Sequence, residues 1–377
     1  LDMIEKMIDW KTQRSKKEPN TGLGLACTVH VSGKRHFGDY DGSSATIKLN
    51  EDGKALILSG EGECGQGVHT AMCQIAAEEL GLPVEDVEIS RADTDLTTFC
   101  LGAFASRLTY VSGNAVKNAA ANVKQQLFQQ ASEMLEANPE DLIANDGRIF
   151  VTGTQGKSVS VADVARARLF RHNGAPIVGS GSFDADSVLP DSTRFGNESG
   201  AYNYGVQAAQ VRVDPETGQV EILKFVIASD CGTVIYPLGA EGQVEGGLSQ
   251  GIGYALTEGL QIDEGKPVNP NFSDYRIPSM RDMPPLQHAF AESYEPTGPF
   301  GAKGLGELNM DPTAAVISNA IFDAVGVRIR DLPLSAEKVL QALHGHQAEP
   351  FSLGADLLER LRHPERLGDM EGPCFSE

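Results

Sequence analysis

The sequence predicts an α+β fold in which two similar units, each a β-hairpin followed by a glycine loop and a helix, are joined in one chain. Residues 44–59 alternate polar and apolar side chains around an Asp-Gly turn, and a helical apolar spacing over 68–80 follows a glycine loop. The same order returns over 208–259, where the hairpin turn is Pro-Glu-Thr-Gly. We therefore expect two pseudo-repeated hairpin-loop-helix units, the second with its loop at 230–247 and its helix at 248–259.

Between the two units the pattern predicts shorter elements. They are a strand at 84–90, a loop at 91–107, a long helix from about 112 to 135, a hairpin at 147–160 and a helix at 161–170. The glycine- and serine-rich segment 171–205 is expected to be an irregular surface excursion and the main internal boundary.

The ends of the chain carry their own signals. Residues 1–17 read as an amphipathic helix with charges throughout. A helix over 311–326 is predicted with Asp311 as its cap, Pro312 in its first turn and Gly326 at its stop. A strand over 327–333 and a helix over 335–343 would then close the globular part.

These elements divide the chain into five segments. We expect an N-terminal helix and linker at 1–21, a first subdomain at 22–170, the excursion at 171–205, a second subdomain at 206–344 and a C-terminal tail at 345–377. The tail has three prolines and mixed charges, which suits a segment that lies on the surface or wraps onto a partner.

Composition limits the classes of function. The chain has 377 residues, 41% hydrophobic and 22% charged, which is a globular composition. A formal net charge of -21 disfavours nucleic acid and anionic membrane surfaces as partners, because both would be repelled. No apolar run approaches the roughly 18 residues of a membrane helix, so we expect no membrane segment and a cytoplasmic location.

The cysteines point to no metal cluster. Six are present and no two form a C-x-x-C pair, so neither a zinc site nor a four-cysteine iron-sulfur cluster can be drawn from them. We expect reduced thiols.

Four glycine-containing turns lie at or beside expected helix starts, at 62–67, 102–113, 239–247 and 301–306. A helix amino terminus offers unpaired N–H groups to anionic ligands, so several such turns could surround one extended ligand. None of the four has the spacing of a P-loop or of a dinucleotide-binding fold.

Single side chains in these turns leave alternatives open. Gln66 and Gln243 would bind a heterocycle or only stabilise their own loops. His69 would be a metal ligand, or would cap or pack in the first helical turn. Arg107 would anchor a phosphate or pair with an acidic residue.

The stretch "GPFGAKGLGELNMDP" at 298–312 sets Glu307 directly after its last glycine. Such glycine density indicates close approach of the backbone to another group. From spacing alone, Glu307 is either a site carboxylate or a surface carboxylate paired with Lys303.

Four motifs occur in order: "GEGECGQGVHTAMCQIAAEELGLPVEDVEI", "GAFASRLTYVSGNAV", "GQVEGGLSQGIGYAL" and "GAKGLGE". Together they resemble the molybdenum-binding subunit of the xanthine dehydrogenase and aldehyde oxidase family, the molybdenum hydroxylases. The resemblance runs from about Gly22 to Leu343 and covers the carboxy-terminal half of that subunit. It implies that 22–170 and 206–344 are molybdopterin-binding subdomains.

The resemblance also implies a cofactor site. Residues expected to bind molybdopterin, as the cytosine dinucleotide form, are Cys64, Gly65, Gln66, Gly67, Ala105, Ser106, Arg107, Gln243, Gly304 and Gly306. The triplet at 65–67 would contact the dithiolene, the triplet at 105–107 would hold the pterin and its extension, and Gln243 would bind the pterin ring. Many relatives carry serine in place of Ala105. The molybdenum would be held by cofactor sulfurs, with no direct protein ligand.

By the same resemblance Glu307 is the catalytic base. It would take the proton from a molybdenum-bound hydroxide that attacks an electrophilic carbon, while hydride passes to the metal's sulfido ligand. Electrons would then leave through Fe-S clusters to FAD on partner subunits.

The family's amino-terminal half has no counterpart in the motifs. The resemblance therefore implies an obligate hetero-oligomer with a companion molybdenum subunit, an Fe-S subunit and an FAD subunit; the alternative is that this sequence belongs to a longer polypeptide.

For substrate we favour hydroxylation of an aromatic or N-heterocyclic small molecule. The alternatives are reduction of the kind catalysed by hydroxybenzoyl-CoA reductase, aldehyde dehydrogenation, and a cofactor-binding scaffold subunit without a catalytic role.

Overall fold

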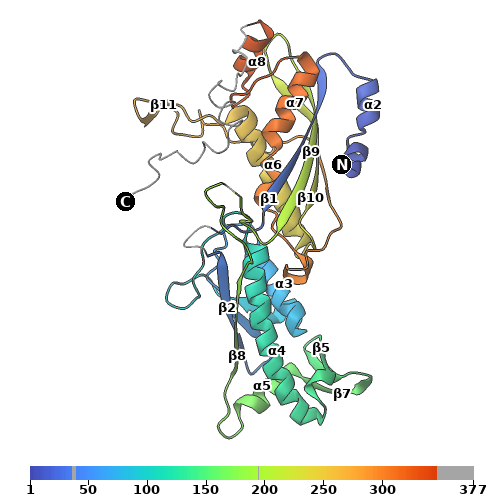
Figure 1. Ribbon diagram of the computed structural model, residues 1–377, viewed down its shortest axis with the longest axis vertical. Helices are drawn as coiled ribbons and strands as arrows, with labels where there is room; N and C mark the ends of the chain where they lie inside the picture. The colour runs from blue at the N-terminus through green and yellow to red at the C-terminus, as the bar shows by residue number, and fades with distance from the viewer. Residues whose placement is uncertain (36–39, 194, 346–377) are drawn as a thin grey trace.

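Two four-stranded sheets, one in each half of an elongated molecule, carry the fold (Figure 1). A computed structural model describes residues 1–35, 40–193 and 195–345. The order of hairpin, loop and helix appears in both halves, so the predicted α+β class with two such units is confirmed.

The first sheet has the strand order β4-β3-β2-β8. β2 pairs antiparallel with β3 and β8, and β3 pairs parallel with β4. Two helices, α3 and α4, cover one face of this sheet (Figure 1). The bounds are β2 Gly42–Leu49, β3 Ala55–Leu58, α3 Val68–Leu80, β4 Val87–Ile89, α4 Gly113–Leu135 and β8 Ile177–Asp184.

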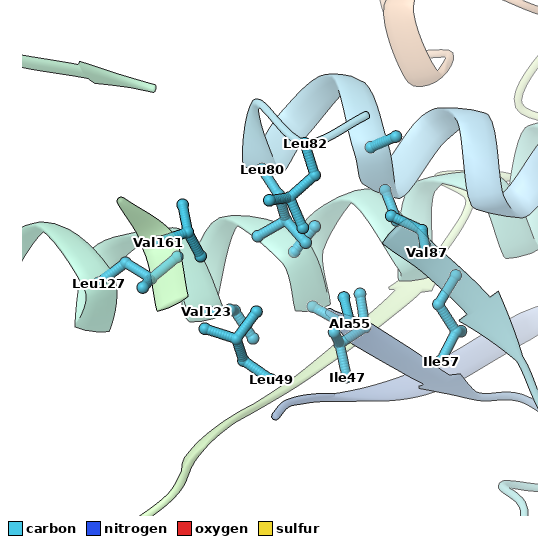
Figure 2. Close-up of a cluster of buried hydrophobic side chains, with 14 of the residues drawn as sticks. Ile47, Leu49, Ala55, Ile57, Leu80, Leu82, Val87, Val123, Leu127 and Val161 are labelled. Atoms are coloured by element: carbon cyan, nitrogen blue, oxygen red, sulfur yellow. The ribbon is translucent and has the colours of Figure 1, made fainter. Parts of the chain in front are cut away.

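Alternation along the strands explains the core of this half. Ile47 and Ile57 are fully buried and face Val123 and Leu127 of α4 together with Leu80 of α3 (Figure 2). Close approach of β8 to α4 also requires glycine. A Cβ on Gly181 would lie 2.2 Å from the backbone nitrogen of Ala119, so a side chain there would push helix and strand apart.

A small three-stranded sheet follows at the far end of this half. Its strands are β5 Leu142–Asn145, β6 Arg148–Val151 and β7 Thr154–Ser160, and helix α5 Val161–Leu169 comes next. Ser160 caps α5 by accepting a hydrogen bond from the Asp163 N–H, as expected for serine at that position.

The second sheet has the order β1-β9-β10-β13, antiparallel except for the β10–β13 pair. Helices α6 and α7 cover one face, and the N-terminal α1 packs on the other (Figure 1). The bounds are α1 Asp2–Met7, α2 Trp10–Ser15, β1 Thr21–Val31, β9 Tyr202–Val213, β10 Val220–Asp230, α6 Pro237–Ile252, β13 Leu286–Phe290, α7 Thr313–Val325 and α8 Ala336–Leu343.

Shorter elements complete the chain. A ribbon of β11 Ile262–Asp263 and β12 Lys266–Pro267 projects beside α6 (Figure 1). Single helical turns are η1 Val84–Asp86, η2 Leu108–Ser112, η3 Pro139–Asp141, η4 Gly253–Thr257, η5 Pro299–Gly301 and η6 Glu307–Asn309. The η2 and η4 turns are π-helical. The η2 turn leads directly into α4, and the η4 turn directly follows α6.

Several predicted elements are wrong in detail. The single helix at 1–17 is two helices, because Asp9 takes a left-handed conformation with φ 53° between them. The excursion 171–205 is not irregular throughout, since it contains β8 and the first residues of β9. No strand is assigned over 327–333 in the described chain.

The glycine loop 230–247 is shorter than predicted, because α6 already begins at Pro237. Pro312, not Asp311, is the N-cap residue of α7, and Gly326 ends that helix with φ 76° as expected. Strands β1 and β13 were not predicted. The tail 345–377 lies outside the described residues except for Gly345, and the subdomain boundaries stay a prediction. No described helix is long and apolar enough to cross a membrane.

Candidate functional site

A cavity of about 410 Å³ lies where the glycine loops of the two units meet. Its walls come from four stretches: 64–71, 103–109, 231–250 and 303–310. Eight predicted site residues line it, namely Cys64, Gln66, Gly67, Ser106, Arg107, Gln243, Gly306 and Glu307. Gly65, Ala105 and Gly304 belong to the same loops but are not among the lining residues.

The loop before α3 is organised by Glu63. Its Oε1 accepts hydrogen bonds from Gly65 N–H at 2.8 Å and Gly67 N–H at 3.0 Å, and its Oε2 accepts from His69 N–H at 3.0 Å. Burial alone would raise the pKa of Glu63, but these three bonds hold it below its ordinary value. The N–H groups that the sequence predicted as open to an anion are thus occupied by an acidic residue that sequence reasoning missed.

Gln66 stabilises its own loop. Its Nε2 donates to Gly62 O at 2.8 Å and its Oε1 accepts from Cys64 N–H at 2.7 Å. His69, similarly, contacts Glu61 O through Nε2 at 3.0 Å. In this structure both side chains are hydrogen-bonded within their own loop region, as in the alternative of local stabilisation. The space beside the loop is open, since a Cβ on Gly65 would meet nothing within 4 Å.

Two consecutive residues in the second loop take left-handed conformations. Ala105 has φ 49° and Ser106 has φ 50°, which costs on the order of 1 kcal/mol or more for each non-glycine residue. Gly33 N–H donates to Ala105 O at 2.7 Å and helps to hold this shape. The turn aims the Ser106 hydroxyl at Glu307, on the other half of the molecule.

The Arg107 side chain is fully buried and paired within the first unit. Its Nε donates to Asp41 Oδ1 at 2.8 Å and its Nη2 donates to Gly42 O at 2.8 Å. Burial raises the pKa of Asp41 above its ordinary value, against the opposing effect of the guanidinium. The alternative of pairing with an acidic residue is therefore realised, although buried Nη1 has no hydrogen-bond partner among the described residues.

Glycine is required where the loop that carries Glu307 passes the Ser106 loop. A Cβ on Gly304 would lie 2.2 Å from Ser106 O, well inside contact distance. Gly304 N–H donates to Ser32 Oγ at 3.0 Å, and Gly304 O accepts from Asn203 Nδ2 at 2.6 Å. Asn203 on β9 and Ser32, which directly follows β1, thus fix the backbone of the Glu307 loop at Gly304.

A buried polar network supports the η6 turn on which Glu307 stands. Gln207 Nε2 donates to Asn309 O at 2.6 Å, and Ser229 Oγ donates to Asn309 Oδ1 at 2.6 Å. Thr313, at the start of α7, donates through Oγ1 to Gln207 Oε1 at 2.9 Å. Satisfied buried networks of this kind specify one geometry, so the turn is held rigidly.

Glu307 itself is half-exposed at the cavity. Its Oε2 accepts a hydrogen bond from Ser106 Oγ at 3.1 Å and lies 3.6 Å from His30 Nε2. The alternative pairing with Lys303 is not formed. Lys303 instead lies 2.8 Å from Asp230 Oδ2. Burial would raise the pKa of Asp230, but hydrogen bonds from Lys303 and a serine hydroxyl keep it below its ordinary value.

These features suit a large polar organic cofactor. The cavity combines exposed glycine backbone, the carboxamide of Gln243 beside Gly306, the hydroxyl of Ser106 and the carboxylate of Glu307. Groups of three or more His, Cys, Asp or Glu arranged for a metal ion are absent from the described part of the chain.

The sequence profile of the molybdopterin cofactor-binding domain matches residues 3–284. The chain belongs to this family. This molybdopterin-binding chain is 35% identical over 353 residues to a xanthine dehydrogenase molybdenum-binding subunit of Escherichia coli O157:H7, covering 91% of this chain and 45% of that protein. It is 31% identical over 362 residues to a nicotine 6-hydroxylase large subunit of Paenarthrobacter nicotinovorans, covering 92% and 44%.

Solved structures agree with the sequence comparison. Quinoline 2-oxidoreductase from Pseudomonas putida 86 superposes with a TM-score of 0.80 at 29% identity, over 91% of this chain and 45% of that one. An aldehyde oxidoreductase from Desulfovibrio gigas gives a TM-score of 0.76 at 28% identity, over 91% and 35%. The predicted membership of the molybdenum hydroxylase family and its fold are thus confirmed, and the molybdopterin-binding chain spans less than half the length of these relatives.

Proposed function

We propose that this chain supplies the base and one wall of the cofactor site in a molybdenum-hydroxylase oxidoreductase. The observation that carries the proposal is the placement of Glu307. This carboxylate directly follows the glycine-rich loop 301–306 and lines the cavity. Hydrogen bonds from both halves of the fold hold it or the turn on which it stands. When bound, molybdopterin supplies the redox-active metal centre for the oxidation.

The chain's own residues divide into a cradle and a base. Backbone at Gly306, the Ser106 turn and the Gln243 carboxamide would hold the organic cofactor, while Gly67 would shape its loop and Arg107, paired with Asp41, would fix the turn that follows Ser106. Hydrogen bonds from preorganised N–H and amide groups orient a ligand without reorganisation at the moment of reaction. Cys64, Gly65, Ala105 and Gly304 would contribute by shaping these loops.

Glu307 would take and hold a proton during the reaction. Its Oε2 is anchored by Ser106, while no described residue hydrogen-bonds to Oε1. A carboxylate held in place by such a hydrogen bond is suited to general-base work when a bound cofactor and substrate exclude water from the cavity. Removal of such a base typically costs 10²–10⁴-fold in rate.

For the substrate we propose an aromatic or N-heterocyclic small molecule, hydroxylated at a ring carbon. Support comes from the names of relatives, which include a nicotine 6-hydroxylase and a quinoline 2-oxidoreductase. We further propose the cytosine dinucleotide form of the cofactor, a companion portion of the molybdenum subunit, Fe-S and FAD partner subunits, and a cytoplasmic location.

The test is Glu307→Gln in the assembled complex, assayed with an artificial electron acceptor over a panel of N-heterocycles and aldehydes. We expect kcat to fall at least about 100-fold while the molybdenum and pterin contents stay at the wild-type level. Glu245→Gln, an exposed helix residue outside the cavity lining, is the matched control and should leave kcat unchanged. Full turnover in the Glu307 variant would support a scaffold subunit instead.

A further inference from the structure

His30 and Glu307 form a pair across the two units' junction that the proposed mechanism does not use. His30 lies on β1, and its Nε2 is 3.6 Å from Glu307 Oε2. Its side chain is mostly buried, with 18% of its surface exposed, and it packs beneath the η6 turn. The two residues are 277 positions apart, so only the fold brings them together.

The other ring nitrogen fixes the tautomer. His30 Nδ1 lies 2.8 Å from Val31 O, and a carbonyl oxygen can only accept a hydrogen bond. Nδ1 therefore carries the proton whether the ring is neutral or charged. Nε2 is left as the nitrogen that gains or loses a proton, and it faces the Glu307 carboxylate.

We propose that His30 receives the proton that Glu307 takes up, so that the carboxylate regains its basic form before the next turnover. The bond between the proton and Glu307 Oε2 breaks, an Nε2–H bond forms, and the imidazolium, whose side chain is 18% exposed, then releases the Nε2 proton to water. The inference rests on the proposed function of Glu307, and it makes His30 a positioning and proton-accepting residue for that base.

The backbone positions both His30 and the loop that carries Glu307. His30 pairs in register with Asn203 of β9, and the Asn203 side chain donates to Gly304 O at 2.6 Å. The same strand pair therefore positions the imidazole and the loop that carries the carboxylate. Ser106 Oγ holds Glu307 Oε2 from the other side, so the carboxylate cannot turn away from Nε2 without breaking that bond.

Other charged groups near the pair do not replace His30. Asp311 is a second carboxylate, and burial raises its pKa, with His30 opposing and Glu307 adding to that rise. Lys303, which also lines the cavity, is occupied by Asp230 at 2.8 Å. Of the groups named here, the imidazole is the one whose unpartnered nitrogen lies 3.6 Å from the Glu307 carboxylate.

The same sheet provides a matched control. His288 on β13 lies 4.0 Å from Glu241 Oε1, with side-chain exposures of 23% and 48%, against 18% and 47% for His30 and Glu307. Neither His288 nor Glu241 lines the cavity. This pair has the same chemistry and similar exposure but lies outside the proposed site.

The first test needs no turnover. The assembled complex carrying [15N]histidine in this chain is examined by 15N NMR, with the His30 signals assigned by their loss in His30→Gln. We expect Nδ1 to be the protonated nitrogen of the neutral ring, and a changed Nε2 signal in Glu307→Gln. His288 signals should respond to Glu241→Gln and not to Glu307→Gln. A protonated Nε2 in the neutral ring, or no response to Glu307→Gln, would overturn the proposal.

The second test measures kcat and KM in the same complex. We expect His30→Gln to lower kcat by about 10- to 100-fold at unchanged KM, and His288→Gln to leave both unchanged. Added imidazole should restore turnover in His30→Ala, because a small base can then take the proton from Glu307; a purely structural loss would not be restored. Glu307→Gln should be inactive with or without imidazole.

The outcomes separate the two proposals. An inactive Glu307→Gln beside a fully active His30→Gln refutes the role of His30 and leaves the proposed function standing. Full activity in Glu307→Gln refutes the proposed function itself. If the His30 variants do not fold, the histidine signals that change in Glu307→Gln identify His30, and their chemical shifts still decide which nitrogen faces Glu307.

Discussion

A single oxygen atom, Oγ of Ser106, makes two hydrogen bonds to Glu307. It accepts from the Glu307 N–H at 3.0 Å and donates to Glu307 Oε2 at 3.1 Å. The serine stands in the first unit and the glutamate in the second, so this hydroxyl joins the two units at the proposed base. The left-handed conformation of Ser106, with φ 50°, is what turns the hydroxyl toward the glutamate.

Ser106→Ala is therefore expected to loosen Glu307 without unfolding the protein. A hydrogen bond to a charged group contributes about 1.5–3 kcal/mol, and part of that loss should appear as a roughly tenfold fall in kcat. Ser158→Ala removes a half-buried serine that accepts from Arg148 at 2.9 Å in a remote strand, and it should leave kcat unchanged. Equal kcat for both variants would show that the Ser106 hydroxyl does not position the base.

Gly304→Ala should disrupt the contact between Ser106 and Glu307 through a steric clash. The new Cβ would lie 2.2 Å from Ser106 O, a backbone atom that cannot swing aside like a flexible side chain. We expect a loss of about 1–3 kcal/mol in the free energy of unfolding, together with most of the activity.

Gly246→Ala is the matched control for that change. Gly246 is exposed within α6 and a Cβ there meets nothing within 4 Å, so alanine should stabilise the helix by about 0.5–1 kcal/mol. Thermal unfolding of both variants decides the point. Equal stability of Gly304→Ala and wild type would mean that the loops separate freely.

The sequence predicts those elements whose apolar residues follow a clear period. The hairpin around residue 50 and helices α3 and α4 bury one face each, so their patterns are plain. Strand β1 was missed because glycines replace its apolar residues where α7 lies close. A Cβ on Gly24 would be 1.9 Å from Val316 O.

Glycine also explains why the sequence predicts a loop where α6 begins. Gly247 lies inside the helix because α6 packs against the η6 turn, and a Cβ there would lie 2.9 Å from the Cβ of Asn309. A local pattern cannot tell glycine used for close packing from glycine used for a turn. Glu307 contacts Ser106 and His30, which lie 201 and 277 positions away in the sequence. No sequence spacing indicates these contacts.

Thiol labelling should report cofactor binding at Cys64. Cys64 is exposed and lines the cavity, and Cys27 is exposed on β1 outside it. Burial raises the pKa of Cys73, Cys100 and Cys231 to about 11, so at pH 7.5 these thiols are almost entirely protonated and unreactive.

Labelling with iodoacetamide at pH 7.5 should therefore modify Cys27 and Cys64 in the cofactor-free chain. In the cofactor-loaded complex we expect Cys64 to be labelled at least about tenfold more slowly, because the ligand covers the loop at 64–67. The measurement is mass spectrometry of the separate cysteine peptides before and after removal of the cofactor. Equal labelling rates for Cys64 in both states would place the cofactor elsewhere.

Glu63 should make the stability of the first glycine loop depend on pH. Its folded pKa is below the ordinary value of 4.5, because Gly65, Gly67 and His69 donate N–H groups to it against the effect of burial. A carboxylate with a lowered pKa adds stability that is fully present above the ordinary value and is lost as the pH falls through the folded value. The stabilising window therefore covers neutral pH and closes in acid.

Glu63→Gln should accordingly destabilise the protein at pH 7 and matter less in acid. A capping interaction of this kind contributes about 0.5–2 kcal/mol, and the exposure of Glu63 to solvent favours the lower end, about 1–2 °C in Tm. The difference in Tm between wild type and variant should shrink steadily when the pH is lowered from 7 toward 3.5. Because other carboxylates titrate equally in both proteins, a difference that stays constant or grows in acid would show that the neutral carboxyl caps α3 as well as the charged one does.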